Sequence, residues 1–187
     1  MKKSKTHYPK IHKACSIDGL RPNFAYVFVS KEAIKATDAH VLIQHKTSEI
    51  FRNGLVESLP KKAILIHCIH FAEMTRLGCE YHKVEKGLIK YRYRDLWYYV
   101  PFQVDGKDIN WMKTESIWPE KIEAIEAIGI NPNLLNKAVE ALDYDARNIR
   151  INFYSQMRGM IITIIPIGNF PSAKAIVMPV SIPGLVS

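Results

Sequence analysis

The order of secondary structure predicted along the chain occurs twice, and this repeat is the strongest constraint on its fold. Residues 63–101 contain a short apolar strand, a helix and about three extended segments, and residues 128–182 repeat that order. The 187 residues are enough for one large or two small domains with a buried core. We therefore predict an α+β fold built from repeated units of a helix packed on antiparallel sheet.

The individual elements follow from apolar spacing and turn residues. Residues 131–143 form the clearest helix, because Asn131 can cap it, Pro132 suits its first turn and its apolar residues share one face. We expect a shorter helix that ends at Gly78. The remaining expectations are a helical turn in 119–128, a loop at 50–61, a long hairpin over 79–101 with its turn at 94–96, and strands at 24–29, 33–37, 41–43, 63–67, 148–154, 160–165 and 175–182.

The charge of the chain is positive and unevenly placed. There are 26 Lys and Arg residues against 18 Asp and Glu, so the net charge is +8 and nucleic acid is the first partner to consider. Charge that only keeps the protein soluble is the alternative. Residues 1–20 are predicted to form an exposed basic arm whose lysines bind DNA. These lysines are Lys2, Lys3, Lys5, Lys10 and Lys13.

A second candidate for nucleic-acid binding is the alternation of cations and rings in Lys90-Tyr91-Arg92-Tyr93-Arg94. Exposed rings accept bases, while guanidinium groups contact phosphates. An ordinary half-buried strand has the same period of two, and we favour that interpretation.

The composition also indicates a compartment. No apolar run reaches the roughly 18 residues that a membrane span requires, and the first residues are not those of a signal peptide. Cys15, Cys68 and Cys79 form an odd set, which indicates reduced thiols instead of a disulfide framework. We expect a cytoplasmic protein.

No residue pattern in the sequence indicates catalysis. We find no nucleophile with a base, no carboxylate pair and no Gly-rich phosphate loop, and Asp38 belongs to a turn. We therefore expect a protein that is not an enzyme and has no metal or cofactor. A zinc-bound nucleic-acid protein is a minor alternative, because its four candidate ligands match no known zinc motif. These ligands are Cys68, His70, Cys79 and His82.

Several segments resemble, in the same order, motifs of one protein family. Residues 36–42, Ala-Thr-Asp-Ala-His-Val-Leu, resemble the signature ATDGHRL, and residues 105–107 resemble the start of a DGKFPDY segment. Residues 177–180, Val-Met-Pro-Val, resemble the C-terminal VMPMRL. With further similarity at residues 21–22 and 128–142, the match covers about residues 20–182. The family is that of bacterial DNA sliding clamps, the beta subunit of DNA polymerase III.

This resemblance implies a DNA-clamp-like fold and a role as a DNA replication processivity or accessory factor. In clamps, six such domains close into a ring around DNA, and a hydrophobic pocket between the last two domains binds short linear motifs of polymerases and other replication proteins. The implied partners are therefore replication proteins and double-stranded DNA, with a homo-oligomer as the assembly. Matched motif by motif, the pocket residues are Thr37, Ala39, His40, Val41, Leu42, Pro119, Val177, Met178, Pro179 and Val180. The alternative is that these are core strand residues.

The chain also departs from the clamp pattern. A full bacterial clamp has three domains, whereas this chain resembles the middle domain over 21–118 and the last half-domain over 119–187. Ala39 replaces the signature glycine, and Val41 replaces its arginine. The clearest helix carries Lys137 beside Glu140 and Asp143, which is not a basic lining for DNA. A clamp-derived peptide-binding module that does not encircle DNA is therefore the main alternative function.

Overall fold

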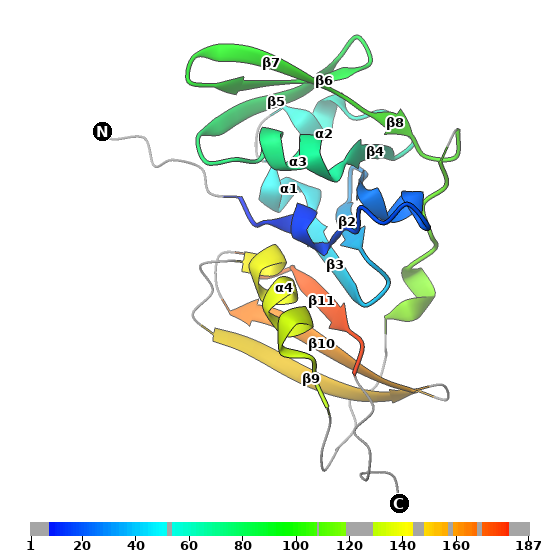
Figure 1. Ribbon diagram of the computed structural model, residues 1–187. Helices are drawn as coiled ribbons and strands as arrows, with labels where there is room; N and C mark the ends of the chain where they lie inside the picture. The colour runs from blue at the N-terminus through cyan, green and yellow to red at the C-terminus, as the bar shows by residue number, and fades with distance from the viewer. Residues whose placement is uncertain are drawn as a thin grey trace, which may run out of the picture.

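The computed structural model describes residues 8–51, 54–107, 109–118, 129–143, 148–156, 159–167 and 170–179. Its main element is an eight-stranded sheet with the order β8-β4-β1-β2-β3-β11-β10-β9, in which all neighbouring strands are antiparallel (Figure 1). The strands are β1 (Tyr26–Val29), β2 (Ala33–Thr37), β3 (Val41–Lys46), β4 (Ile64–His67), β8 (Gln103–Val104), β9 (Asn148–Gln156), β10 (Gly159–Ile167) and β11 (Lys174–Val177). The pairing of β3 with β11 joins the strands of the second predicted repeat to the N-terminal strands of the chain, whereas residues 79–101 of the first repeat form a separate sheet.

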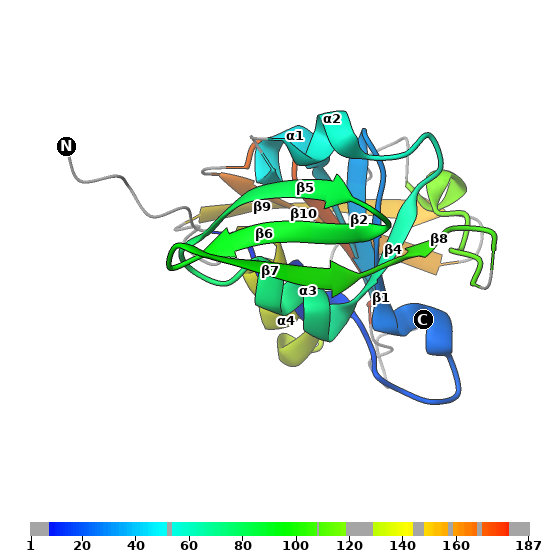
Figure 2. The same ribbon diagram turned by 90° about the horizontal axis from the view of Figure 1, so that it is seen from above.

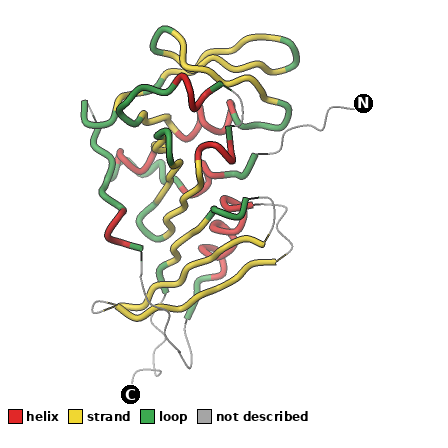
Figure 3. Tube along the Cα trace, turned by 180° about the vertical axis from the view of Figure 1, so that it is seen from behind, coloured by secondary structure: helices red, strands yellow, loops and turns green. Residues whose placement is uncertain are grey.

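Helices cover one face of this sheet. The α4 helix (Pro132–Asp143) packs on β3, β10 and β11, while α3 (Cys68–Met74) packs on β1 and β4 (Figures 1 and 2). Seen from behind, β9 and β10 lie in front of α4 (Figure 3). Among the described residues, no helix has the length and apolar character needed to span a membrane.

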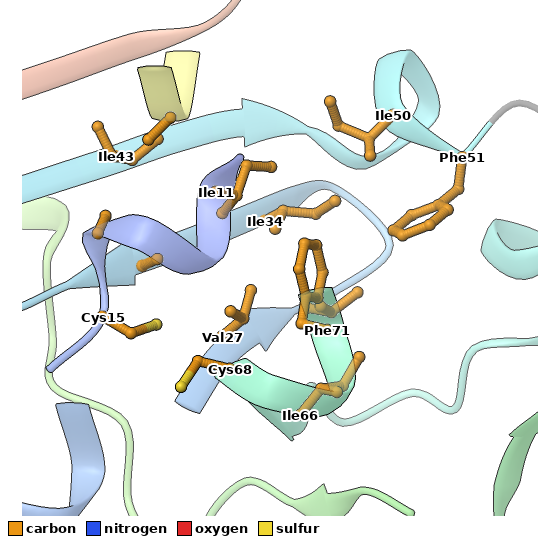
Figure 4. Close-up of a cluster of buried hydrophobic side chains, with 14 of the residues drawn as sticks. Ile11, Cys15, Val27, Ile34, Ile43, Ile50, Phe51, Ile66, Cys68 and Phe71 are labelled. Carbon is orange, nitrogen blue, oxygen red and sulfur yellow. The ribbon is translucent and has the colours of Figure 1, made fainter. Parts of the chain in front are cut away.

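A short N-terminal 3₁₀-helix, η1 (Ile11–Ala14), contacts both α3 and α4. Ile11 and Ala14 are fully buried there, and Ile11 belongs to the same core cluster as Ile34, Ile43 and Phe71 (Figure 4). The expectation of an exposed arm over residues 1–20 is therefore wrong for η1, because apolar residues three apart fill the space between the two helices.

A second, smaller sheet packs on the other side of α3. It has the order β5-β6-β7, with β5 (Cys79–Glu85), β6 (Leu88–Tyr93) and β7 (Leu96–Pro101) (Figure 2). The α2 helix (Leu55–Ser58) contacts β5, and α1 (Thr47–Ile50) follows β3. The loop predicted at 50–61 therefore contains the whole of α2, whose Leu55 is fully buried in the core.

Most predicted elements are confirmed. The α+β class is confirmed, and each of α3 and α4 is followed by three antiparallel strands in chain order. The predicted hairpin over 79–101 has three strands, because the chain also turns at Lys86-Gly87, where φ is 50° and 78°. The helical turn predicted in 119–128 lies outside the described residues.

The sheet face opposite the helices is crossed by the segment 109–118, which contains the 3₁₀-helix η3 (Glu115–Ile117). Trp111 packs against Phe28 of β1, with ring centroids 5.7 Å apart. The Lys35 ammonium of β2 donates to Thr114 Oγ1 at 2.9 Å and to Glu115 at 2.7 Å. We call these residues 109–118 the outer segment.

Candidate functional site

The residues matched to the clamp pocket meet where β3 pairs with β11. Leu42 lies opposite Ile176, and Val41 lies opposite Val177. The pairing continues past the strand ends, because the Met178 amide donates to the His40 carbonyl at 2.9 Å. Two segments that are more than a hundred residues apart in the sequence therefore form one surface, which we call the β3–β11 junction.

A tight turn over residues 37–41 shapes one side of this junction. The Asp38 carboxylate oxygen Oδ1 accepts hydrogen bonds from the amides of His40 (2.9 Å) and Val41 (2.8 Å). The Ala39 amide donates to Thr37 Oγ1 at 3.1 Å, and Ala39 itself has a φ of 78°. Asp38 is thus a turn residue, as its sequence context predicts. The left-handed φ explains why a glycine suits this position in the clamp signature.

The turn is fixed to the helical layer by an ion pair. The Lys137 ammonium of α4 donates to Asp38 Oδ2, and the two side chains are 25% and 11% exposed. Lys137 also donates to the Cys15 carbonyl at 3.5 Å. A partly buried, charge-assisted bond of this kind holds the turn in one position relative to α4.

The predicted pocket residues divide between the two faces of the sheet. Val41 and Val177 belong to the core beneath α4, and they are 1% and 0% exposed. Because side chains alternate along a strand, Leu42 and Ile176 point to the opposite face. Neither belongs to the core cluster, although both are at most 5% exposed.

The accessible part of the junction is smaller than the motif match suggests. Met178 is 52% exposed, His40 is exposed and Pro179 is half-buried. Thr37 is buried beside them, on the same face as Lys35 and Leu42. The interpretation as core strand residues therefore fits Val41 and Val177, whereas His40 and Met178 are available to a partner.

The outer segment contacts β11 at Lys174, the end of the strand away from Met178. The Lys174 ammonium of β11 lies 3.9 Å from the ring centroid of Trp118. Burial, and then the nearby charge of Lys35, lowers the pKa of Lys174. Ile176 was not predicted as a site residue, because only the pairing of β11 with β3 brings it beside Leu42. Pro119 and Val180 lie outside the described residues.

The lysines predicted to bind DNA do not form a free basic surface where the structure describes them. Lys10 and Lys13 both form ion pairs with Glu140 of α4, and the Lys10 ammonium lies 3.5 Å from Glu140 Oε1. The hydrogen bond from Lys13 lowers the pKa of Glu140. Lys2, Lys3 and Lys5 lie outside the described residues.

The candidate zinc ligands Cys79 and His82 are each engaged with a backbone carbonyl. The Cys79 thiol donates to the Glu73 carbonyl at 3.3 Å, and His82 Nε2 lies 2.6 Å from the Met74 carbonyl. Cys68 instead lies near Cys15 in the core (Figure 4). Across the described part of the chain, no three His, Cys, Asp or Glu residues are grouped so as to hold a metal ion.

His45 connects β3 to the helical layer. It lies in β3 with no exposed surface, and its Nε2 is 3.0 Å from the Ala141 carbonyl of α4. Its other ring nitrogen, Nδ1, is buried with no hydrogen-bond partner. Burial lowers the pKa of His45 to about 4, so the ring is neutral at physiological pH.

Comparison with known proteins reveals similarity in structure only. No protein-family model and no curated protein matches the sequence. The beta chain of DNA polymerase III from Streptococcus pneumoniae is 13% identical, with a TM-score of 0.53 over 97% of this chain and 67% of that chain. The beta clamp of Helicobacter pylori in complex with 3,4-difluorobenzamide is 10% identical, with a TM-score of 0.54 over 95% and 65%. The same clamp bound to a DNA ligase peptide is 11% identical, with a TM-score of 0.50 over 95% and 65%.

The chain spans about two thirds of the length of these clamps. The order of elements, the two helix-and-sheet units and the continuous sheet agree with this similarity. Identities of 10–13% show the fold alone. The chain therefore has the fold of bacterial DNA sliding clamps, over a length that corresponds to only part of such a clamp.

Proposed function

We propose that this protein is a sliding-clamp-like accessory factor of DNA replication, without catalytic activity, that binds short peptide segments of replication proteins at the β3–β11 junction. The observation that carries the proposal is the convergence of two clamp-like motifs on one surface with Met178 and His40 exposed. A thioether is an adaptable apolar contact, and His40 adds a polar group that can orient a peptide. The H. pylori clamp, which has this fold, binds a DNA ligase peptide.

Peptide binding is favoured over DNA tracking by the charges on the helical layer. Lys10, Lys13 and Lys137 are all engaged by carboxylates of this chain, namely Glu140 and Asp38. Cations held in internal pairs contribute little to the counterion release that drives phosphate binding. The function that fits this surface is a clamp-derived module that tethers a partner protein.

A labelled peptide with the sequence of the ligase peptide that the H. pylori clamp binds provides the test, with fluorescence anisotropy as the readout. Met178→Glu is expected to weaken binding at least about tenfold, because a charge placed in an apolar contact loses more than 1.4 kcal/mol. Leu77→Glu is the matched control, since Leu77 is also 52% exposed but lies after α3. Equal effects of the two variants, or no binding to the unmodified protein, would overturn the proposal.

The mass in solution separates the two forms of the proposal. A discrete oligomer with enough units to close a ring, measured by light scattering on a sizing column, supports a clamp that encircles DNA. Such an oligomer is then expected to stay on circular DNA and to slide off linear DNA. A strict monomer supports the peptide-binding module, because one chain has too few units to surround a duplex.

A further inference from the structure

A pocket of about 480 Å³ opens on the outer face of the β5-β6-β7 sheet and shares no lining residue with the β3–β11 junction. Tyr81 and Trp97 form part of its wall, and both rings are exposed, by 42% and 50%. The volume is within the range of small-molecule sites, roughly 300 to 1,000 Å³. Two exposed aromatic rings beside one pocket are a feature that a solvated sheet face does not require.

The rings of this pocket are not those of the basic and aromatic sequence motif. Tyr91 of that motif points into the core and is 3% exposed, which confirms the half-buried strand. Its neighbour in β6, Lys90, points outward and lies beside Trp97 and Tyr99 of β7. The outward cations of β6 thus meet rings that come from adjacent strands, and only strand pairing creates this platform.

Local backbone irregularity exposes Tyr81. The register of β5 against β6 shifts between Glu80 and Lys83, and Tyr81 has a φ of 56° there. A bulge of this kind redirects a side chain away from the regular alternation. His82, the next residue, points inward and is 2% exposed, so the pair places one ring outside and one ring in the core.

Gly54 and His82 form a close-packed part of the pocket lining. Gly54 has a φ of 82°, and a Cβ built on it would lie 3.0 Å from the His82 carbonyl oxygen. A side chain at Gly54 would therefore be strained and would enter the pocket region. Burial lowers the pKa of His82 to about 4, so this ring stays neutral.

Positive charge surrounds the rings. Lys83 and Lys90 line the pocket, and the Lys90 ammonium lies 4.6 Å from the Trp97 ring centroid. The one acidic residue of the lining, Glu85, forms an ion pair with Lys90 at 3.4 Å. Arg92 lies 4.2 Å from the Tyr81 ring centroid but donates to the Glu80 carboxylate at 2.6 Å, so its charge is largely compensated. Lys83 forms no ion pair among the described residues and is the free cation of the lining. Rings and cations together match a ligand that is both aromatic and anionic.

We propose that this pocket binds a nucleotide of single-stranded nucleic acid. The base stacks on the Trp97 or Tyr81 ring, and Lys83 contacts a neighbouring phosphate, while Lys90, paired with Glu85, stays beside the Trp97 ring. The strand must be single because a base in a duplex cannot leave the stack to reach the rings without the cost of unpairing. The net charge of +8 supports attraction of a polyanion.

Fluorescence anisotropy with a labelled oligothymidylate tests this site on the full chain. Trp97→Ala is expected to weaken binding by roughly five- to 150-fold, the range found when one stacking ring is removed. Trp97→Phe, which keeps a ring, is expected to retain most of the affinity. Lys83→Glu is expected to weaken binding and to reduce the slope of log affinity against log salt by about 0.7 per lost phosphate contact.

Two control variants keep the exposed surface but avoid the pocket. Leu96→Ala changes a residue of the same strand that is 62% exposed and does not line the pocket. Lys61→Glu changes the charge at an exposed position elsewhere. Both variants are expected to keep at least about half of the unmodified protein's affinity for the oligonucleotide, in contrast to Trp97→Ala.

Three outcomes would overturn the proposal. They are no binding of the oligonucleotide, binding that Trp97→Ala and Lys83→Glu leave unchanged, and binding of an acidic peptide in place of the oligonucleotide at the same residues. Met178→Glu separates this proposal from peptide capture at the β3–β11 junction. That variant is expected to leave the affinity for the oligonucleotide unchanged, whatever it does to the peptide.

Discussion

Acid is expected to destabilise this protein through His45, which lies between β3 and α4. The pKa of this histidine is about 4 in the folded chain, against 6.5 for an unperturbed histidine. Burial is the cause, and the Nδ1 atom that would take the second proton has no hydrogen-bond partner. Protonation would place an unpaired charge in the core next to Phe170, whose ring centroid is 5.8 Å away.

The sign and size of the effect follow from this difference in pKa. Between pH 6.5 and about pH 4 the unfolded chain binds a proton that the folded chain excludes, so the free energy of unfolding falls as the pH falls. The contribution of His45 to stability is fully present above pH 6.5, the pKa of a histidine in the unfolded chain. For a difference of this size, His45 alone accounts for a loss of about 2 kcal/mol at about pH 5.

Urea unfolding followed by circular dichroism at about pH 7.5 and about pH 5 measures this loss. His45→Gln is the comparison variant, because its amide can still donate to the Ala141 carbonyl but cannot be protonated. The decrease in unfolding free energy between the two pH values is expected to be about 2 kcal/mol smaller in the variant. The same decrease in both proteins would refute the reasoning, since all other titrating groups are shared.

The remaining predictions concern the turn at the junction and the core, each measured by urea unfolding. Lys137→Ala is expected to lower the free energy of unfolding by about 1 to 2 kcal/mol, because it leaves the Asp38 carboxylate without its cation. The control Lys31→Ala, at an exposed turn, is expected to change it little, and equal losses in the two variants would contradict this. Ala39→Gly is expected to raise the free energy of unfolding by about 0.5 to 1 kcal/mol. Removing the strain of the left-handed φ at Ala39 gains more than the entropic cost of ordering a glycine, so a loss of stability would argue against strain at this turn. Phe71→Ala removes a fully buried ring and is expected to cost about 3 to 5 kcal/mol, so a loss below about 1 kcal/mol would place Phe71 outside the core.

The helix over 131–143 and the strands that follow it were predictable, because apolar spacing and turn residues are local signals. The three strands within 79–101 were harder to predict, because the first turn is marked in the sequence only by Gly87, which lies in a run of alternating residues. The short helices α1 and α2 were missed, because four residues are too few to show a helical period. Their buried residues, such as Leu55, are explained by tertiary packing.

The candidate site was predicted in part. The clamp-like motifs identified the turn at Asp38 and the strand end at Met178, which the structure brings together. The sequence could not tell that Val41 and Val177 face the core, because the register of β3 against β11 decides which side each residue takes. It also could not show that Lys10 and Lys13 pair with Glu140, since a lysine in a basic run looks the same whether or not a distant carboxylate neutralises it.

The sequence by itself determined the α+β class, the repeated helix-and-sheet units and the tight turn at Asp38, because each depends on residues that are close along the chain. Only the tertiary structure decided which groups are accessible and which are paired. The junction of β3 with β11, the Lys137–Asp38 ion pair and the platform of Trp97 with Lys90 all join residues from different elements. Such contacts depend on strand register and helix packing, which a local pattern of residues does not specify.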